Sequence, residues 1–75
     1  MTDSHNLHVE VQGGDIIVTL PGTGYRISYG RVGGRARLAA FDYVMDSEAD
    51  TAPSVFLTRS LKAANDKARE LGWIV

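Results

Sequence analysis

The chain has 75 residues, a formal net charge of −1, 44% hydrophobic and 23% charged residues, and no cysteine. This length allows one domain, close to the lower size limit for an unaided hydrophobic core, and the missing cysteines exclude disulfides and thiolate metal sites. The nearly balanced charge argues against a general nucleic-acid binder, and no apolar run approaches the roughly 18 residues of a membrane span. We therefore expect a soluble cytoplasmic protein that does not enter a membrane.

The first forty-five residues indicate a β-meander over residues 7–45, after a polar tail at residues 1–6 that we expect to be disordered. Apolar and polar residues alternate on both sides of Gly13-Gly14, and paired glycines supply the positive φ of a two-residue hairpin. The alternation predicts two half-buried strands. Their expected core positions are Leu7, Val9, Val11, Ile16, Val18 and Leu20.

A third strand is predicted after Pro21-Gly22, a pair that suits the central positions of a type II turn. In residues 25–32, Tyr25, Ile27 and Tyr29 alternate with polar side chains and glycine. Three strands joined by tight turns predict an antiparallel meander.

Residues 35–45, which follow a second Gly-Gly pair, allow two interpretations. As a strand, the segment would place Arg37, Ala39, Phe41 and Tyr43 on one face and Leu38, Ala40 and Val44 on the other. A short helix is the alternative, because Leu38, Phe41 and Met45 recur at helical spacing and alanine favours helices. The repeated Gly-Gly and the aromatic, β-branched character favour the strand.

The remaining residues predict an acidic loop at 46–54, a helix at 55–72 and a short apolar tail at 73–75. The helix could begin at Pro53 with Thr51 as its cap, or after an extended segment at Thr58. Gly72 fits the left-handed position past a helix end, with Trp73 packing back near Ala68. The expected buried stripe of the helix is Leu57, Leu61, Ala64, Ala68 and Leu71.

The predicted fold class is α+β: a three- or four-stranded antiparallel β-meander with one C-terminal α-helix packed on one face. This arrangement leaves the second face of the sheet uncovered. We expect functional contacts on that face or at an edge strand.

Arginines and tyrosines gather in the second half of the meander, and between Asp15 and Asp42 the chain has no acidic residue. Arginine interleaved with aromatic residues on a sheet can contact phosphates and stack on bases. The alternative is an edge hairpin kept soluble by charge, with the tyrosines in the core. The candidate contact residues for nucleic acid or another partner are Arg26, Arg31, Arg35, Arg37, Tyr25, Tyr29 and Tyr43.

The sequence provides no assembled catalytic set. The histidines, His5 and His8, would point to opposite faces of a strand and cannot converge on one metal. The acidic residues between Asp42 and Asp50 lack the order of a calcium loop, and the glycine pairs lack the strand–turn–helix context of phosphate loops. We expect no enzyme activity, no cofactor and no bound metal.

Two segments, Ala64–Trp73 and Asp15–Gly22, resemble those of a group of short uncharacterised alphaproteobacterial proteins, which implies no particular activity or ligand. The strand–strand–strand–helix order also looks like that of AP2-type DNA-binding domains. In those domains the sheet lies in the major groove, and the matching positions here would be Arg26, Arg31, Arg35 and Arg37. The acidic loop departs from such a basic surface.

Two functions from different classes follow. The first is a non-catalytic protein-interaction module that binds an unknown protein or itself through the uncovered face or an edge strand. The alternative is a weak nucleic-acid-binding domain that uses the hairpin from Arg26 to Arg37.

Overall fold

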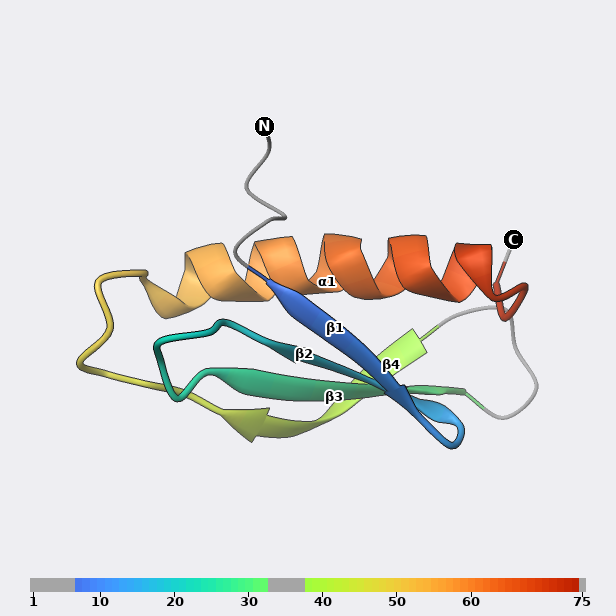
Figure 1. Cartoon of the computed structure of the whole chain (residues 1–75), viewed down its shortest axis with the longest axis horizontal. Coiled ribbons are helices and arrows are strands. Elements are labelled where there is room, and N and C mark those ends of the chain that lie inside the picture. Colours follow the sequence, from blue (N-terminus) through green and yellow to red (C-terminus); the bar gives the residue numbers. More distant parts are fainter. Residues whose placement is uncertain (1–6, 33–37, 75) are drawn as a thin grey trace.

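The computed structural model of the chain describes residues 7–32 and 38–74, and it has the predicted α+β fold. Four strands are followed by one helix that runs along one face of the sheet (Figure 1). Three sets of predictions concern residues outside these ranges: the tail at residues 1–6, the turn at Gly33-Gly34, and the contact residues Arg35 and Arg37. The elements are β1 (His8–Gln12), β2 (Asp15–Thr19), β3 (Arg26–Arg31), β4 (Leu38–Val44) and α1 (Pro53–Glu70).

The strands form one antiparallel sheet in the order β1-β2-β3-β4, which confirms the meander. Gly13 and Gly22 adopt φ values of 60° and 87°, as the two predicted turns require. The Thr23 backbone N–H donates to the Leu20 carbonyl at 3.1 Å and closes the turn over Pro21-Gly22. The ends of the meander, β1 and β4, are consequently the edges of the sheet.

The fourth segment is a strand, and the helical alternative for it is wrong. β4 pairs with β3 along its whole length, and this tertiary pairing overrides the helical spacing of Leu38, Phe41 and Met45. The register shifts between Ser28 and Tyr29, which pair with Asp42 and Ala40 respectively. Phe41 is therefore the additional residue of a β-bulge.

The helix begins at Pro53 rather than at residue 55 or Thr58, because proline is preorganised for the first helical turn. Ala52 occupies the N-cap position without a side-chain hydrogen bond, so the expectation that Thr51 caps the helix is wrong. Regular helix ends at Glu70, and Gly72 then adopts a φ of 78°. The Trp73 N–H donates to the Ala68 carbonyl at 2.8 Å and the Gly72 N–H to the Arg69 carbonyl at 3.1 Å, which completes the predicted Schellman motif.

The helix buries only part of the predicted stripe: Ala64 and Ala68 are buried as predicted, but the three leucines are not. Phe56, Ser60, Ala64 and Ala68 are fully buried, whereas Leu57, Leu61 and Leu71 are 38–48% exposed. The reason is the ring of Phe56, which stacks on Tyr25 with ring centroids 4.6 Å apart and so rotates the helix away from its leucines. The small side chains of Ala64 and Ala68 then allow close approach to the sheet. The buried cluster contains Ile16, Val18, Leu20, Tyr25, Ile27, Tyr29, Phe56, Ala64 and Ala68.

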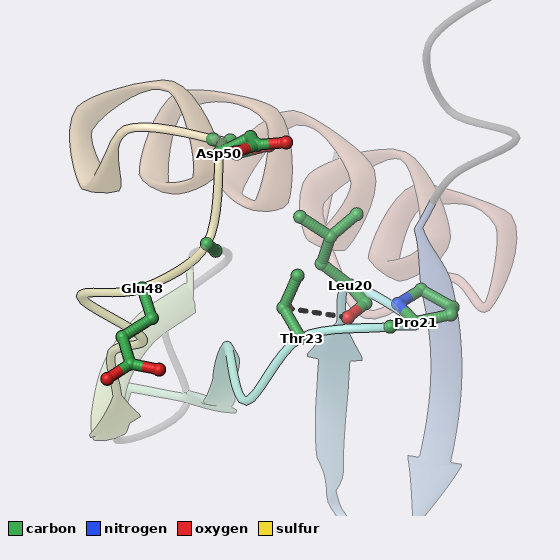
Figure 2. A pocket seen from close by; sticks show the side chains of 8 residues that line it. Leu20, Pro21, Thr23, Glu48 and Asp50 are labelled. Atoms are coloured by element: carbon green, nitrogen blue, oxygen red, sulfur yellow. Dashed lines mark hydrogen bonds between the residues drawn. The ribbon is translucent and has the colours of Figure 1, made fainter.

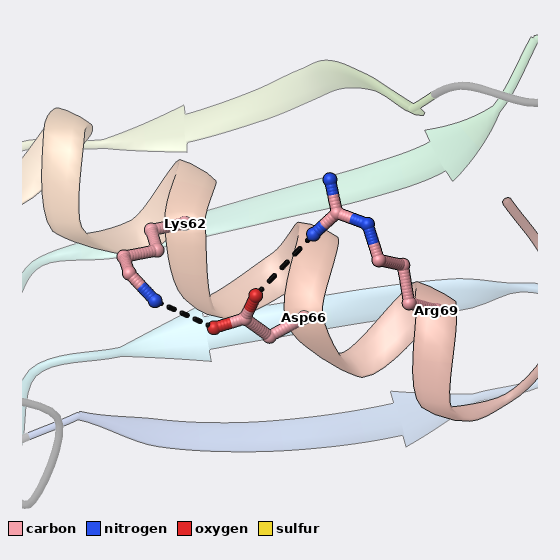
Figure 3. Close-up of polar contacts among 3 residues, drawn as sticks. All are labelled: Lys62, Asp66 and Arg69. Carbon is pink, nitrogen blue, oxygen red and sulfur yellow. Dashed lines mark hydrogen bonds and ion pairs between the residues drawn. The ribbon is translucent and has the colours of Figure 1, made fainter. Parts of the chain in front are cut away.

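The outward face of α1 carries charged side chains that pair with each other. Asp66 accepts hydrogen bonds from Lys62 at 2.9 Å and from Arg69 at 3.4 Å (Figure 3). Such exposed pairs contribute only about 0.3–0.5 kcal/mol each. Within residues 7–32 and 38–74, no helix is both long enough and apolar enough to cross a membrane.

Candidate interaction surface

The two edges of the sheet differ in chemistry. In β1 the polar residues His8, Glu10 and Gln12 lie on the open face and the two valines on the helix side. His8 Nε2 lies 3.8 Å from Glu10 Oε1. β4 has the sequence Leu-Ala-Ala-Phe-Asp-Tyr-Val, with a single charged residue. Natural proteins protect edge strands with charges, proline or covering segments, because an edge exposes unpaired backbone groups. Each edge strand has one acidic residue and no lysine or arginine, but the exposed side chains of β1 are mostly polar and those of β4 are mostly apolar.

Large apolar side chains are exposed along β4 and just after it. The exposed fractions are 57% for Phe41, 56% for Tyr43, 43% for Val44 and 40% for Met45. Helix α1 does not cover these residues, because it packs mainly on β2 and also touches β1. We define the β4 edge surface as Phe41, Asp42, Tyr43, Val44 and Met45.

The bulge at Phe41 decides which way these side chains point. Tyr43 pairs with Ile27 and so lies on the helix-side face, whereas Asp42 pairs with Ser28 on the open face. A β-carbon added to Gly30 would lie 3.3 Å from Cε1 of Phe41, so the Phe41 ring lies beside this glycine. The predicted alternation, with Phe41 and Tyr43 on one face, is therefore wrong, because an extra residue breaks the period of two.

The open face of the sheet is more acidic than basic in the described residues. One row across it consists of Glu10, Ile17, Ser28 and Asp42. Ile17 and Ser28, at the centre of this row, are buried. This face therefore has three carboxylates, those of Asp15 and of the two residues that end the row, Glu10 and Asp42. It has one guanidinium, that of Arg26. Phosphate groups would meet an unfavourable charge on this part of the face.

Two of the predicted contact residues, Tyr25 and Tyr29, are core residues. Both are almost completely buried, and their hydroxyls bond within the protein. The Tyr25 hydroxyl donates to the Thr51 carbonyl at 2.6 Å, and that of Tyr29 lies 2.7 Å from Ser60 Oγ. Tyr25 and Tyr29 are therefore not contact residues, and the alternative that places tyrosines in the core is correct for both, because strand alternation turns their rings toward the helix.

The remaining predicted contact residues are not gathered on one face. Arg26 and Arg31, five residues apart on β3, point to opposite faces of the sheet. Arg31 lies on the helix side, where its guanidinium carbon sits 4.6 Å from the centroid of the Trp73 ring. Arg35 and Arg37 lie outside the described residues. Of the predicted tyrosines, Tyr43 alone is exposed, and it belongs to the β4 edge surface.

A depression of about 500 Å³ lies between the β2–β3 turn and the acidic loop (Figure 2). Asp46 fixes this loop, because its carboxylate accepts hydrogen bonds from the backbone N–H groups of Gly24 at 2.8 Å and Glu48 at 3.0 Å. These bonds, led by that from Gly24, lower the pKa of the Asp46 carboxyl. The side chains of Glu48 and Asp50 point in different directions in Figure 2 and do not converge. No group of three acidic or histidine side chains in the described part of the chain could hold a metal ion.

Comparisons of the chain with protein-family models, with curated proteins and with solved structures found no match. The two resemblances noted from the sequence therefore stay predictions. Within residues 7–32 and 38–74, the β4 edge surface is the most exposed apolar feature of a sheet edge, and this makes it the candidate interaction surface.

The sequence prediction included Tyr43 but missed Phe41, Asp42, Val44 and Met45 as contact candidates. The sequence nevertheless contained an indication that this segment is a poorly protected edge strand. The last strand of a meander is an edge, and this one has a single charged residue between Leu38 and Met45.

Proposed function

We propose that the chain is a small, non-catalytic protein-interaction module that binds a polypeptide strand along β4. The observation that supports this proposal is the set of large apolar side chains, 40–57% exposed, along an edge strand with one charge. Exposed apolar groups that adjoin unpaired backbone groups are typical of surfaces that accept an added strand.

The two parts of the β4 edge surface have different roles in this proposal. The backbone of β4 supplies hydrogen bonds to the incoming strand, which give affinity with little dependence on sequence. Tyr43 on the helix side and Val44 on the open side flank that strand above and below, and they select apolar side chains in it. Removing their surface from water contributes about 25 cal/mol per Å² of apolar area.

Site-specific photo-cross-linking tests this function. A benzophenone-bearing amino acid replaces Phe41, a conservative exchange at an aromatic position that is exposed. The matched control carries the same group at Val11 on the opposite edge, which is also exposed. After irradiation in cells, we expect discrete polypeptide adducts from position 41 and none from position 11, with the adducts identified by mass spectrometry. Equal labelling from both positions, or none from position 41, contradicts the proposal.

Nucleic-acid binding is the weaker alternative. Among the described candidates, Arg26 and Arg31 are on opposite faces and Tyr25 and Tyr29 are buried, so these residues offer no continuous platform. A titration with labelled single-stranded DNA or RNA at low salt tests the alternative, because phosphate contacts weaken steeply as salt increases. Binding that is lost in Arg26→Glu would favour it over the edge-strand function.

A further inference from the structure

We propose that the strand bound by β4 is the β4 of a second copy of this chain, paired antiparallel about a two-fold axis at Tyr43. This inference rests on the proposed function and names its partner. A 75-residue domain without disulfides lies near the size at which one core suffices, so an added interface also supplies stability. Pairing of two identical edges is isologous and closes after two copies.

The position of the axis follows from which residues can lie opposite each other. Residues paired across antiparallel strands point to the same face of the sheet. A two-fold at Ala40 would pair Leu38 with Asp42, and one at Phe41 would pair Ala40 with Asp42; in both cases the bulge has placed the two residues on opposite faces. Both positions are therefore excluded.

Charge excludes two more positions. A two-fold at Asp42 places this carboxylate opposite its own copy, and like charges directly opposite are destabilising. A two-fold axis at Val44 would place Asp42 opposite Asp46 of the second copy, which is again a contact of like charges. The Asp46 carboxylate cannot easily turn away from it, because it is bound to the Gly24 N–H. Between residues 40 and 44, Tyr43 is the remaining position. It pairs Tyr43 with Tyr43 of the second copy and Asp42 with Val44 of the second copy.

Charge complementarity across this axis supports a second copy as the partner. Arg26 pairs with Val44 within one chain, so one row of the open face would run from Arg26 across Val44 to Asp42 of the second copy. Arg26 and that Asp42 are two strand spacings apart, about 10 Å between Cα atoms, which an arginine can bridge with its stem lying on Val44. The two-fold axis would generate two copies of this ion pair, one on each side of the axis. In the described part of a single chain, neither Arg26 nor Asp42 has an ion-pair partner.

Charge exchange tests the register. Arg26→Glu and Asp42→Arg each replace an attraction by a repulsion at both pairs, whereas an equimolar mixture of the two variants restores both pairs in a heterodimer. By sedimentation velocity from about 1 µM to about 500 µM, we expect the wild type to dimerise, each variant alone to bind at least about tenfold more weakly, and the mixture to recover wild-type affinity. Glu10→Arg, a charge reversal on β1, is the matched control and keeps the dimer. Circular dichroism verifies that every variant is folded.

A covalent test locates the axis without altering charge. The chain has no cysteine, so Tyr43→Cys introduces a single thiol, which the two-fold places at disulfide distance from its copy. We expect oxidation to give a cross-linked dimer from Tyr43→Cys and none from Val11→Cys on β1.

The outcomes separate this inference from the proposed function. A wild-type chain that stays monomeric to the highest concentration overturns the second copy as partner, while adducts of position 41 with other polypeptides would still support edge-strand binding. A wild-type dimer that resists both charge reversals, or a mixture that does not recover affinity, overturns the register at Tyr43.

Discussion

The Tyr29 hydroxyl lies 2.7 Å from Ser60 Oγ and joins the centre of the sheet to the buried face of the helix. Ser60 Oγ donates its own proton to the Leu57 carbonyl at 3.0 Å. A serine hydroxyl has one proton, so the Tyr29 hydroxyl is the donor to Ser60. The resulting relay leaves every buried side-chain nitrogen and oxygen of the described residues with a partner.

Ser60→Ala should destabilise the fold more than Tyr29→Phe. The alanine leaves the buried tyrosine hydroxyl without its acceptor, which costs about 1–3 kcal/mol, whereas Tyr29→Phe removes one hydrogen bond worth about 1 kcal/mol and leaves Ser60 bonded to Leu57. We expect the double variant to lose less than the sum of the two single losses. Urea unfolding of all four proteins measures this coupling. Strict additivity would show that the two hydroxyls do not interact in solution.

Stability should fall in alkali because of the same tyrosine. Burial raises the pKa of the Tyr29 hydroxyl above its ordinary value of 10.0, against a smaller opposing effect of the Ser60 hydrogen bond. The folded state thus holds the phenol proton more tightly than the unfolded state. This contribution is complete below pH 10.0 and is lost as the pH rises through the folded-state pKa.

Unfolding free energies from about pH 8 to about pH 11 test this linkage. The wild type should lose stability toward the alkaline end, and Tyr29→Phe should show a weaker dependence. Tyr43→Phe is the comparison: repulsion from Tyr43 is the smallest cause of the raised Tyr29 pKa, so this variant should change the slope less than Tyr29→Phe does. An unchanged slope in Tyr29→Phe would assign the alkaline loss to another group.

The meander was predictable because its signals are local. Alternation around Gly13-Gly14 and the Pro21-Gly22 pair depend on residues a few positions apart, and so does the Gly72 helix stop. The rotation of α1 was not predictable in this way. On a helical wheel the leucines and alanines form a coherent stripe. The stacking of Phe56 on Tyr25, 31 positions earlier in the chain, keeps the alanines buried but turns the leucines outward.

The sequence predicted the type of the candidate surface, an edge strand, but not most of the residues that form it. An edge strand was expected to carry contacts, and Tyr43 was among the candidates. The bulge that separates Phe41 from the period of two arises from the pairing of β4 with β3, and alternation within residues 35–45 contains no trace of it. The burial of Tyr25 and Tyr29, in contrast, agrees with the local alternation around Ile27, which favoured the alternative with the tyrosines in the core.

The rotated stripe predicts a large difference between two helix positions. Phe56→Ala should remove about 3–5 kcal/mol, because the buried ring leaves a cavity and loses its stacking on Tyr25. This approaches the whole stability of a domain of this size, so we expect the variant to be largely unfolded at room temperature. Leu61→Ala, at a side chain 48% exposed, should cost less than about 1 kcal/mol. Urea titration followed by circular dichroism measures the two losses in unfolding free energy. Equal losses would indicate that Leu61 is buried as much as Phe56 and would contradict the rotation of the helix.

Gly72 should be needed for its backbone conformation rather than for space. A β-carbon at this position would meet no atom within 4 Å, but the φ of 78° is strained for any side chain. We expect Gly72→Ala to cost about 1 kcal/mol. Gly14→Ala is the matched control, because Gly14 has equally open surroundings and no positive φ, and it should change stability little.

Trp73 reports on the same position directly. It is the single tryptophan of the chain, its backbone N–H donates to the Ala68 carbonyl, and its ring lies against Arg31. If Gly72→Ala loosens the Schellman motif, the Trp73 emission should shift toward longer wavelength before the global unfolding transition, as the half-buried ring gains contact with water. The emission of Gly14→Ala should stay that of the wild type. A Gly72→Ala protein with unchanged emission and unchanged stability would show that the helix end adapts without the left-handed residue.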